Sequence, residues 1–186
     1  MQIISSLTHA SSDKSSTMRH YVTDELSVRL ASVTDMPRIW PIWRQIVACG
    51  ETHPYPRDSN QTDAIALWFK PPLSAVYIAE QAGEVVAAMQ TKPMRYGNGD
   101  HIANFDLMVS ARHRSQGIGR TLSTYVIDAT RRDGYAAMEA YAVVESNVQA
   151  VRLWRSLGFQ ILATVPAAFR HPTFGLVAVH HMHMPL

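Results

Sequence analysis

Apolar and polar positions along this chain follow two different periods, and each period predicts one kind of secondary structure. Apolar residues three and four positions apart are typical of amphipathic helices. They predict helices over residues 37–50, 63–69, 119–132 and 148–157. Short alternating or apolar runs between turn residues predict strands over 26–30, 75–80, 85–91, 101–109, 137–144, 160–165 and 176–184. Two stretches fit neither period and are expected to be irregular, namely 51–58 and 166–175.

The order of these elements predicts one α/β domain. The strands at 75–80 and 85–91 are close enough in sequence to form a hairpin. A helix connects the strands at 101–109 and 137–144, so these two are expected to run parallel. We therefore expect a single domain with a mixed central sheet of six to seven strands and helices on both faces.

The first residues of the chain are expected to lie outside this domain. Six serines fall between Ser5 and Ser16, with little apolar content, which is typical of a flexible leader. The segment has neither the apolar core of a signal peptide nor the many basic residues of a transit peptide. We expect a leader over 1–22 and a folded domain over 23–186.

Composition narrows the class of protein. A chain of 186 residues with 47% apolar content can bury a good core, and its net charge of +2 does not favour nucleic acid as a partner. Cys49 is the single cysteine, so an intrachain disulfide is excluded and a reducing, cytoplasmic location is expected. No apolar run reaches the roughly 18–20 residues that would span a membrane.

The stretch from 104 to 132 predicts an anion site. A strand leads through a basic turn into a helix, whose first turn leaves backbone N–H groups free and carries the positive end of the helix dipole. Gly117 and Gly119 lack the Cβ atoms that would keep a phosphate away from those groups. The turn also holds three arginines, whose guanidinium groups suit phosphate oxygens, at Arg112, Arg114 and Arg120. We interpret this stretch as a pyrophosphate cradle.

The spacing within the cradle distinguishes between phosphate motifs. No Lys-Ser or Lys-Thr follows the second glycine, as a P-loop requires, and Leu122 stands where a dinucleotide fingerprint has its third glycine. The pattern Arg114-x-x-Gly117-x-Gly119 resembles the acetyl-CoA motif of the GCN5-related N-acetyltransferases, although taken alone it also fits an ordinary loop-to-helix junction. A second signature of that family follows about thirty residues later as Asn147-x-x-Ala150-x-x-x-Trp154-x-x-x-Gly158-Phe159.

The resemblance covers residues 26–184 and implies the fold of that family, with acetyl-CoA as co-substrate and no metal. In the family the central strand and its parallel neighbour splay apart, and the pantetheine arm enters the gap. The resemblance implies that the central strand, the basic turn and the following helix hold the cofactor. The implied residues are Leu107, Met108, Val109, Arg114, Ser115, Gln116, Gly117, Ile118, Gly119, Arg120, Asn147 and Trp154.

The chain also looks like the branch of the family that contains yeast enzymes acetylating proline analogues such as azetidine-2-carboxylate. The supporting stretches are 51–56, Asn104, 147–154 and 169–172. This resemblance implies a small-molecule amine as substrate, with contacts from His53, Tyr55, Asn104 and Phe169. Tyr141 departs from the branch, where asparagine is expected, so the identity of the substrate stays open.

Transfer of an acetyl group to an amine requires a neutral amine, and a free amine of this kind has a pKa near 10. A base, acting directly or through water, is therefore expected. Alternation along the central strand places Asn104 and Asp106 with Met108 on one face, opposite an apolar set that is expected to face the core. Asp106 is the first candidate base and Glu139 on the neighbouring strand is a rival, while Asn104 is either a substrate contact or a structural amide.

The acid that would protonate the departing thiolate is less obvious. The family commonly has tyrosine at the position of Trp154, and an indole N–H is too weak an acid for that role. Tyr141 is a substitute, or the thiolate leaves without an acid.

Alternatives to a small-molecule acetyltransferase are an enzyme for protein lysines or N-termini, and a non-catalytic acyl-CoA sensor. The tryptophans of the first two predicted helices suit either the core or the wall of a substrate pocket. Apolar patches there also suit a dimer interface, so a homodimer is open. His180, His181 and His183 do not predict a metal site, because neighbouring strand residues point to opposite faces.

Overall fold

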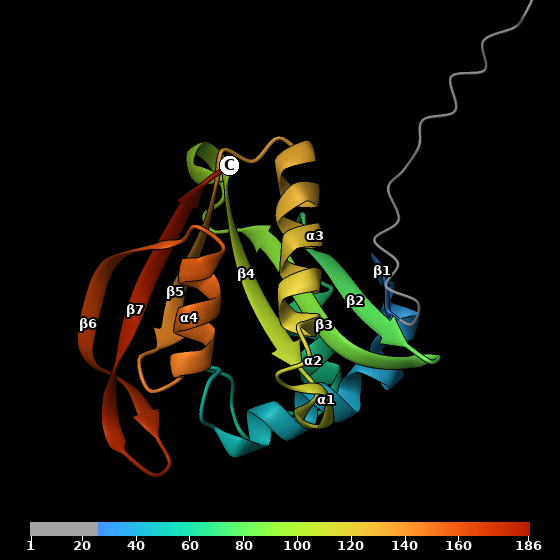
Figure 1. Ribbon diagram of the computed structural model, residues 1–186, viewed down its shortest axis with the longest axis horizontal. Coiled ribbons are helices and arrows are strands. Elements are labelled where there is room, and N and C mark those ends of the chain that lie inside the picture. Colours follow the sequence, from blue (N-terminus) through green and yellow to red (C-terminus); the bar gives the residue numbers. More distant parts are fainter. Residues whose placement is uncertain (1–25) are drawn as a thin grey trace, which may run out of the picture.

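A seven-stranded mixed sheet forms the centre of the computed structural model, which describes residues 26–186 (Figure 1). The expected leader over 1–22 lies outside the described residues. In chain order the strands are β1 (Leu26–Leu30), β2 (Ala75–Gln81), β3 (Glu84–Pro93), β4 (Ile102–Val109), β5 (Ala137–Val144), β6 (Gln160–His171) and β7 (Gly175–Pro185). In the sheet they follow the order β1-β2-β3-β4-β5-β7-β6. All neighbouring strands are antiparallel except β4 and β5, which are parallel as expected.

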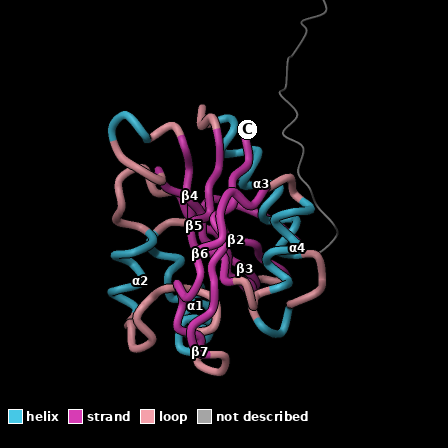
Figure 2. Tube along the Cα trace, turned by 90° about the vertical axis from the view of Figure 1, so that its left-hand side faces the viewer, coloured by secondary structure: helices cyan, strands magenta, loops and turns pink. Residues whose placement is uncertain are grey.

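Four α-helices cover the two faces of the sheet. They are α1 (Met36–Cys49), α2 (Gln61–Trp68), α3 (Ile118–Arg132) and α4 (Val148–Ser156). The helices α1 and α2 lie on one face, and α3 and α4 lie on the other (Figures 1 and 2). Each layer closes its own apolar core, one around Phe105 and Leu122 under α3 and α4, and one around Trp43, Trp68 and Met108 under α1 and α2. No helix among residues 26–186 combines the length and apolar character that crossing a bilayer requires.

The segment that was expected to be irregular between 166 and 175 is largely strand. It prolongs β6 as far as His171, and β6 pairs with β7 along this length. The register shifts between Val165 and Phe169, where Pro166 and the positive φ of Ala167 (54°) interrupt the ladder. Because β6 is an edge strand, a proline without an N–H is tolerated there at a bulge. The proline marks this bulge and not the end of the strand.

The two parallel strands in the middle of the sheet, β4 and β5, are paired only over their first residues. Three residue pairs join β4 to β5, namely Ile102–Ala137, Ala103–Met138 and Asn104–Glu139. Beyond Asn104 the pairing stops, although β4 continues to Val109 and β5 to Val144. The divergence leaves the edge of β4 facing β5 without a strand partner, and a cleft opens at this point.

Candidate active site

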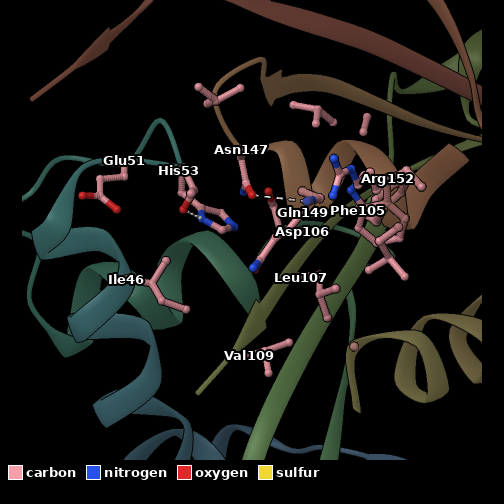
Figure 3. Close-up of a pocket in the computed structure, with 18 of the residues that line it drawn as sticks. Ile46, Glu51, His53, Phe105, Asp106, Leu107, Val109, Asn147, Gln149 and Arg152 are labelled. Carbon is pink, nitrogen blue, oxygen red and sulfur yellow. Dashed lines mark hydrogen bonds between the residues drawn. The ribbon is translucent and has the colours of Figure 1, made fainter. Parts of the chain in front are cut away.

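A cleft of about 770 Å³ occupies the divergence between β4 and β5 (Figure 3). Its lining comes from residues in 51–54, 104–109, 113–120 and 140–156, together with Ile46 and His171. Both faces of β4 contribute, since Asp106 and Leu107 both line it. The apolar face of β4 packs against the core as expected, and its residues Phe105, Leu107 and Val109 also reach the cleft. The cleft lies between two strands of one sheet, so side chains above and below the sheet reach it.

One end of the cleft is formed by the turn before α3. Gly117 is the N-cap of α3 and has φ +80°, a left-handed conformation that glycine adopts without strain. The first helical hydrogen bond runs from Thr121 N to Gly117 O, so the N–H groups of the preceding three residues have no acceptor within the helix. A Cβ on Gly119 would lie 3.4 Å from Val109 Cγ2, which shows how closely α3 approaches β4.

The three arginines of this turn have different surroundings. Arg114 and Arg120 line the cleft, and Arg120 Nη2 donates to Ser156 Oγ at 2.6 Å. Arg114 is exposed and forms no ion pair within residues 26–186. Arg112 lies outside the cleft and pairs with Glu84 at 3.5 Å. Two arginines and a free helix N-terminus therefore remain available for an anion at this end.

Two buried polar atoms in the same lining have no hydrogen-bond partner in the described part of the chain. These atoms are His113 Nδ1 and Ser146 Oγ. Buried polar groups are nearly always hydrogen-bonded, and an unpaired one costs free energy. Their position along the cleft is consistent with a polar ligand that supplies the missing partners. Asn147, by contrast, uses its Oδ1 to accept the N–H of Ala150 at 3.2 Å and so caps α4.

The other end of the cleft contains a carboxylate held by an aromatic chain. Tyr55 Oη donates to Asp106 Oδ2 at 2.7 Å, and Trp68 Nε1 donates to Tyr55 Oη at 3.2 Å. Trp43 stacks on the Tyr55 ring, with centroids 5.5 Å apart. Burial, and next the negative charge of Asp106, raise the pKa of Tyr55 above its usual value, so the phenol keeps its proton. This network fixes one oxygen of Asp106.

His53 lines the same end of the cleft and stacks on Tyr55, with ring centroids 6.1 Å apart. The hydroxyl of Thr52 lies 2.9 Å from His53 Nδ1. Burial lowers the pKa of His53 below its usual value, and the negative charge of Asp106 opposes this shift only in part. The imidazole is therefore neutral at neutral pH.

The two strands that flank the cleft supply Asn104 and Tyr141. Asn104 is buried, and its Nδ2 donates to Glu139 O at 3.1 Å, at the last residue pair before the strands diverge. Its amide thus makes a cross-strand structural bond while it also lines the cleft. Tyr141 lies beyond the divergence and lines the cleft, and burial, then Asp106, raise its pKa.

A family model described as the acetyltransferase (GNAT) family matches residues 40–159, which is more than half of the chain. The chain belongs to the GNAT family. The expected fold is also confirmed, because solved structures of that family share this arrangement of strands and helices.

Similar proteins agree with this assignment. A GCN5-related N-acetyltransferase from Kribbella flavida has 44% identity and a TM-score of 0.83, over 87% of this chain and 98% of that one. The N-acetyltransferase aca1 of Schizosaccharomyces pombe is 30% identical over 104 residues, which cover 54% of this chain and 50% of that protein. The chain therefore spans about half the length of that relative. A Salmonella typhimurium acetyltransferase solved with acetyl-CoA shares the fold, with a TM-score of 0.77 and 24% identity.

Several residues that the GNAT resemblance singled out lie away from the cleft. Met108 is fully buried under α1 and α2, because it lies on the opposite face of β4 from Phe105, Leu107 and Val109. Gln116 points its Nε2 to Arg112 O at 3.2 Å and is exposed. Phe169 packs into a small core between β6 and β7.

Glu139, the rival base, also lies outside the cleft lining. Its carboxylate is 3.3 Å from Arg95 Nη1, and it precedes the divergence of the strands. The structure therefore does not place it where a base would act. Trp154 lines the cleft but is only 5% exposed, and its ring centroid lies 4.6 Å from that of Phe105 and 5.6 Å from that of Phe159, so it packs in the core.

The lining also contains residues that were not proposed as site residues, among them His113, Gln149, Arg152 and His171. His171 lies in the 166–175 stretch, which was expected to be irregular. The other residues do not occupy a defined position of any motif. Cys49 is exposed at the end of α1. In the described range, no three histidine, cysteine, aspartate or glutamate side chains gather in a group that could hold a metal ion.

Proposed function

We propose that this chain is an acetyl-CoA-dependent N-acetyltransferase that acts on a small-molecule amine by direct transfer in a ternary complex. The observation that carries the proposal is the continuous cleft. It leads from an anion site at the start of α3, along the open edge of β4, to the carboxylate of Asp106. Such a path joins a cofactor site to an acceptor site without any covalent attachment to the enzyme.

The residues at the α3 end suit the diphosphate of acetyl-CoA. The free N–H groups of the first turn and the side chains of Arg114 and Arg120 would hold it. The unpaired edge of β4 near Leu107 and Val109 would bind the pantetheine amides as a neighbouring strand does. When bound, the thioester supplies an acetyl group that is already activated for attack by an amine.

At the other end, Asp106 would receive the amine. Its carboxylate attracts the ammonium form and then takes the proton, directly or through water, so that a neutral amine is left in position. Tyr55 holds this carboxylate in one orientation, which favours a defined attack geometry. Trp154 offers no phenol, and a thiol pKa near 8.5 allows the thiolate to leave without a dedicated acid.

The walls of the acceptor end favour a compact acceptor over a peptide. The 51–58 loop is fastened over β4 by the bond from Tyr55 to Asp106 and by the stack on Trp43, and Arg57 Nε donates to Ala48 O at 2.9 Å. The end of β6 lies at the same end of the molecule (Figure 1) and contributes His171. We infer that the acceptor is an amino acid or a proline-analogue-like compound.

The test is steady-state release of CoA thiol with acetyl-CoA and a panel of acceptors. The panel contains free amino acids, cyclic analogues such as azetidine-2-carboxylate, lysine-containing peptides and peptides with free N-termini. Release with compact amines supports the proposal, and release only with peptides replaces it by a protein acetyltransferase. Acetyl-CoA binding without release from any acceptor replaces it by a sensor.

Two single substitutions test whether the carboxylate of Asp106 takes part in the reaction. Asp106→Asn should lower kcat at least tenfold with little change in acetyl-CoA affinity, because the carboxylate is lost but the anion site is intact. Asp58→Asn is the matched control, since Asp58 is an exposed carboxylate on the same side of the molecule in the 51–58 loop. Equal loss in both variants would contradict a specific role for Asp106.

A further inference from the structure

His171 lies at the end of β6, just before the turn into β7, and is only 7% exposed. It nevertheless contributes to the lining of the cleft. The cleft is also lined by His53 of the 51–58 loop and by Tyr141 in the outer part of β5. Val144, at the end of β5, packs with Phe169 of β6 in one small core, which brings the end of β6 close to the outer part of β5. We therefore assign His171 to the acceptor end.

The surroundings of the ring determine which nitrogen carries its proton. Nδ1 accepts the backbone N–H of Thr173 at 3.1 Å and that of Phe174 at 3.3 Å. A nitrogen that accepts hydrogen bonds cannot be protonated, so the neutral ring carries its hydrogen on Nε2. The ring also stacks on Phe174, with centroids 4.6 Å apart and planes 24° apart. Turn and stack together hold the ring in one orientation.

Nε2 makes no hydrogen bond with any other residue in 26–186. Because Nδ1 is occupied by the turn, Nε2 is the ring nitrogen that remains for a ligand in the cleft that His171 lines. His171 thus presents an oriented N–H donor to the acceptor end. A neutral donor of this kind pairs with an oxygen acceptor and does not attract the amine itself.

The charges around the cleft indicate which chemical group supplies the oxygen acceptor for Nε2–H of His171. The basic side chains of the lining, Arg114, Arg120 and Arg152, lie on the turn before α3, on α3 and on α4. At the acceptor end, Asp106 suits the cationic amine, and His171 is the donor on the β6–β7 wall. A molecule with an amine beside a carboxylate complements this pair.

We propose that His171 is a specificity-determining residue that binds the carboxylate of an amino-acid-like acceptor through Nε2–H. This inference rests on the proposed acetyltransferase function and names the group that distinguishes good acceptors from poor ones. An acceptor that lacks the carboxylate leaves Nε2–H without a hydrogen-bond partner. Such an acceptor therefore binds more weakly by the free energy of that one hydrogen bond.

The experiment compares two acceptors that differ only in the carboxylate, such as azetidine-2-carboxylate and azetidine, or the best amino acid of the panel and its decarboxylated amine. In His171→Asn, the amide oxygen replaces Nδ1 as acceptor for the turn, but no group reaches the position of Nε2. We expect kcat/KM for the carboxylated acceptor to fall about tenfold or more, with the decarboxylated amine within about twofold of its original value.

His171→Gln is the complementary variant, because its amide nitrogen can reach the position of Nε2 while the turn loses its acceptor. We expect it to retain most of the preference for the carboxylate and to lower Tm more than His171→Asn does. Acetyl-CoA affinity, measured by calorimetry, should stay unchanged in both variants. Long-range 1H–15N spectra of the wild type should show the proton on Nε2.

Three results would overturn the inference. One is an unchanged preference in a folded His171→Asn variant, and another is a spectrum with the proton on Nδ1. The third is a loss that is equal for both acceptors, which would show a structural role only. If the wild type acetylates no amine at all, the proposed function fails first and this inference fails with it. If His171→Asn keeps its turnover and its preference for the carboxylated acceptor is unchanged, this inference is refuted and the proposed function is not.

Discussion

A negative charge placed at Gly117 is the most direct test of the anion site. Gly117 caps α3 with φ +80°, and a Cβ added there would meet no atom within 4 Å. Both Asp and Asn tolerate a left-handed backbone better than other side chains do. Gly117→Asp and Gly117→Asn therefore impose nearly the same strain and shape, and they differ in one unit of charge.

The size of the effect follows from the position of that charge. Two unit charges roughly 7 Å apart repel by about 0.6 kcal/mol in water and by about 2.4 kcal/mol at an effective dielectric constant near 20. The diphosphate carries two negative charges, so the total for Gly117→Asp should lie between about 1.2 and about 4.8 kcal/mol. Because the site is partly shielded from water, we expect more than about 1.4 kcal/mol, which corresponds to at least a tenfold weaker affinity for acetyl-CoA.

The assay is calorimetric titration with acetyl-CoA at low and high salt, for both variants. We expect Gly117→Asn to bind near the wild-type affinity, Gly117→Asp to bind at least tenfold more weakly, and the gap to narrow at high salt because ions screen the repulsion. Gly134 provides a matched control, since it has φ +88° with open space around it and follows the far end of α3. The same two substitutions there should leave binding unchanged. Equal affinities of Gly117→Asp and Gly117→Asn would refute the cradle.

Three further predictions concern the acceptor end and the stability of the fold. Tyr55→Phe removes the 2.7 Å hydrogen bond to Asp106, and a hydrogen bond to a charged group is worth about 1.5–3 kcal/mol. We therefore expect kcat/KM for the amine to fall about tenfold, with the affinity for acetyl-CoA unchanged. Unaltered turnover would show that Asp106 does not need the bond from Tyr55. His53 should titrate below pH 6.5 in NMR spectra, and Asp106→Asn should lower its midpoint further because the carboxylate opposes the shift; a midpoint above 6.5 contradicts this. Hydrogen bonding to Arg29 lowers the pKa of Asp35 from 3.8 to about 2, so its contribution to stability is present above pH 4 and is lost as the pH falls towards 2. Urea unfolding should therefore show Asp35→Asn less stable at pH 7 by roughly 1–2 kcal/mol, with the difference shrinking as the pH falls below 4 and disappearing below pH 2. A difference that does not shrink over this range would place its cause elsewhere.

Much of the fold was predictable because its determinants are local. Helical and strand periods located the four α-helices and seven strands that residues 26–186 contain, since each amphipathic face reflects a layer that must be buried. The anion site was predictable for the same reason. A left-handed glycine, free N–H groups and nearby arginines all lie within 114–120, and no distant residue is needed to build them.

The acceptor end was less predictable, because it is made by residues far apart in the chain. Tyr55 and Asp106 are separated by 51 positions, and their contact depends on how the 51–58 loop folds over β4. Alternation correctly divided the two faces of β4, but it could not show that a cleft between two strands of one sheet receives side chains from both faces. His171 lies within the 169–172 stretch of the resemblance but was not predicted as a site residue, because the proline at the bulge, Pro166, resembles the end of a strand.

The sequence by itself determined the elements, their order and the turn in which we propose the anion site, because hydrogen bonding within a turn and the φ angle of a glycine depend on immediate neighbours. Only the tertiary structure decided that β4 and β5 separate after Asn104, which excludes Glu139 from the cleft and admits Tyr141. It also decided that Tyr55 and His171 converge on the acceptor end. Contacts of this kind depend on strand register and on the packing of loops against the sheet, which no short stretch of sequence encodes.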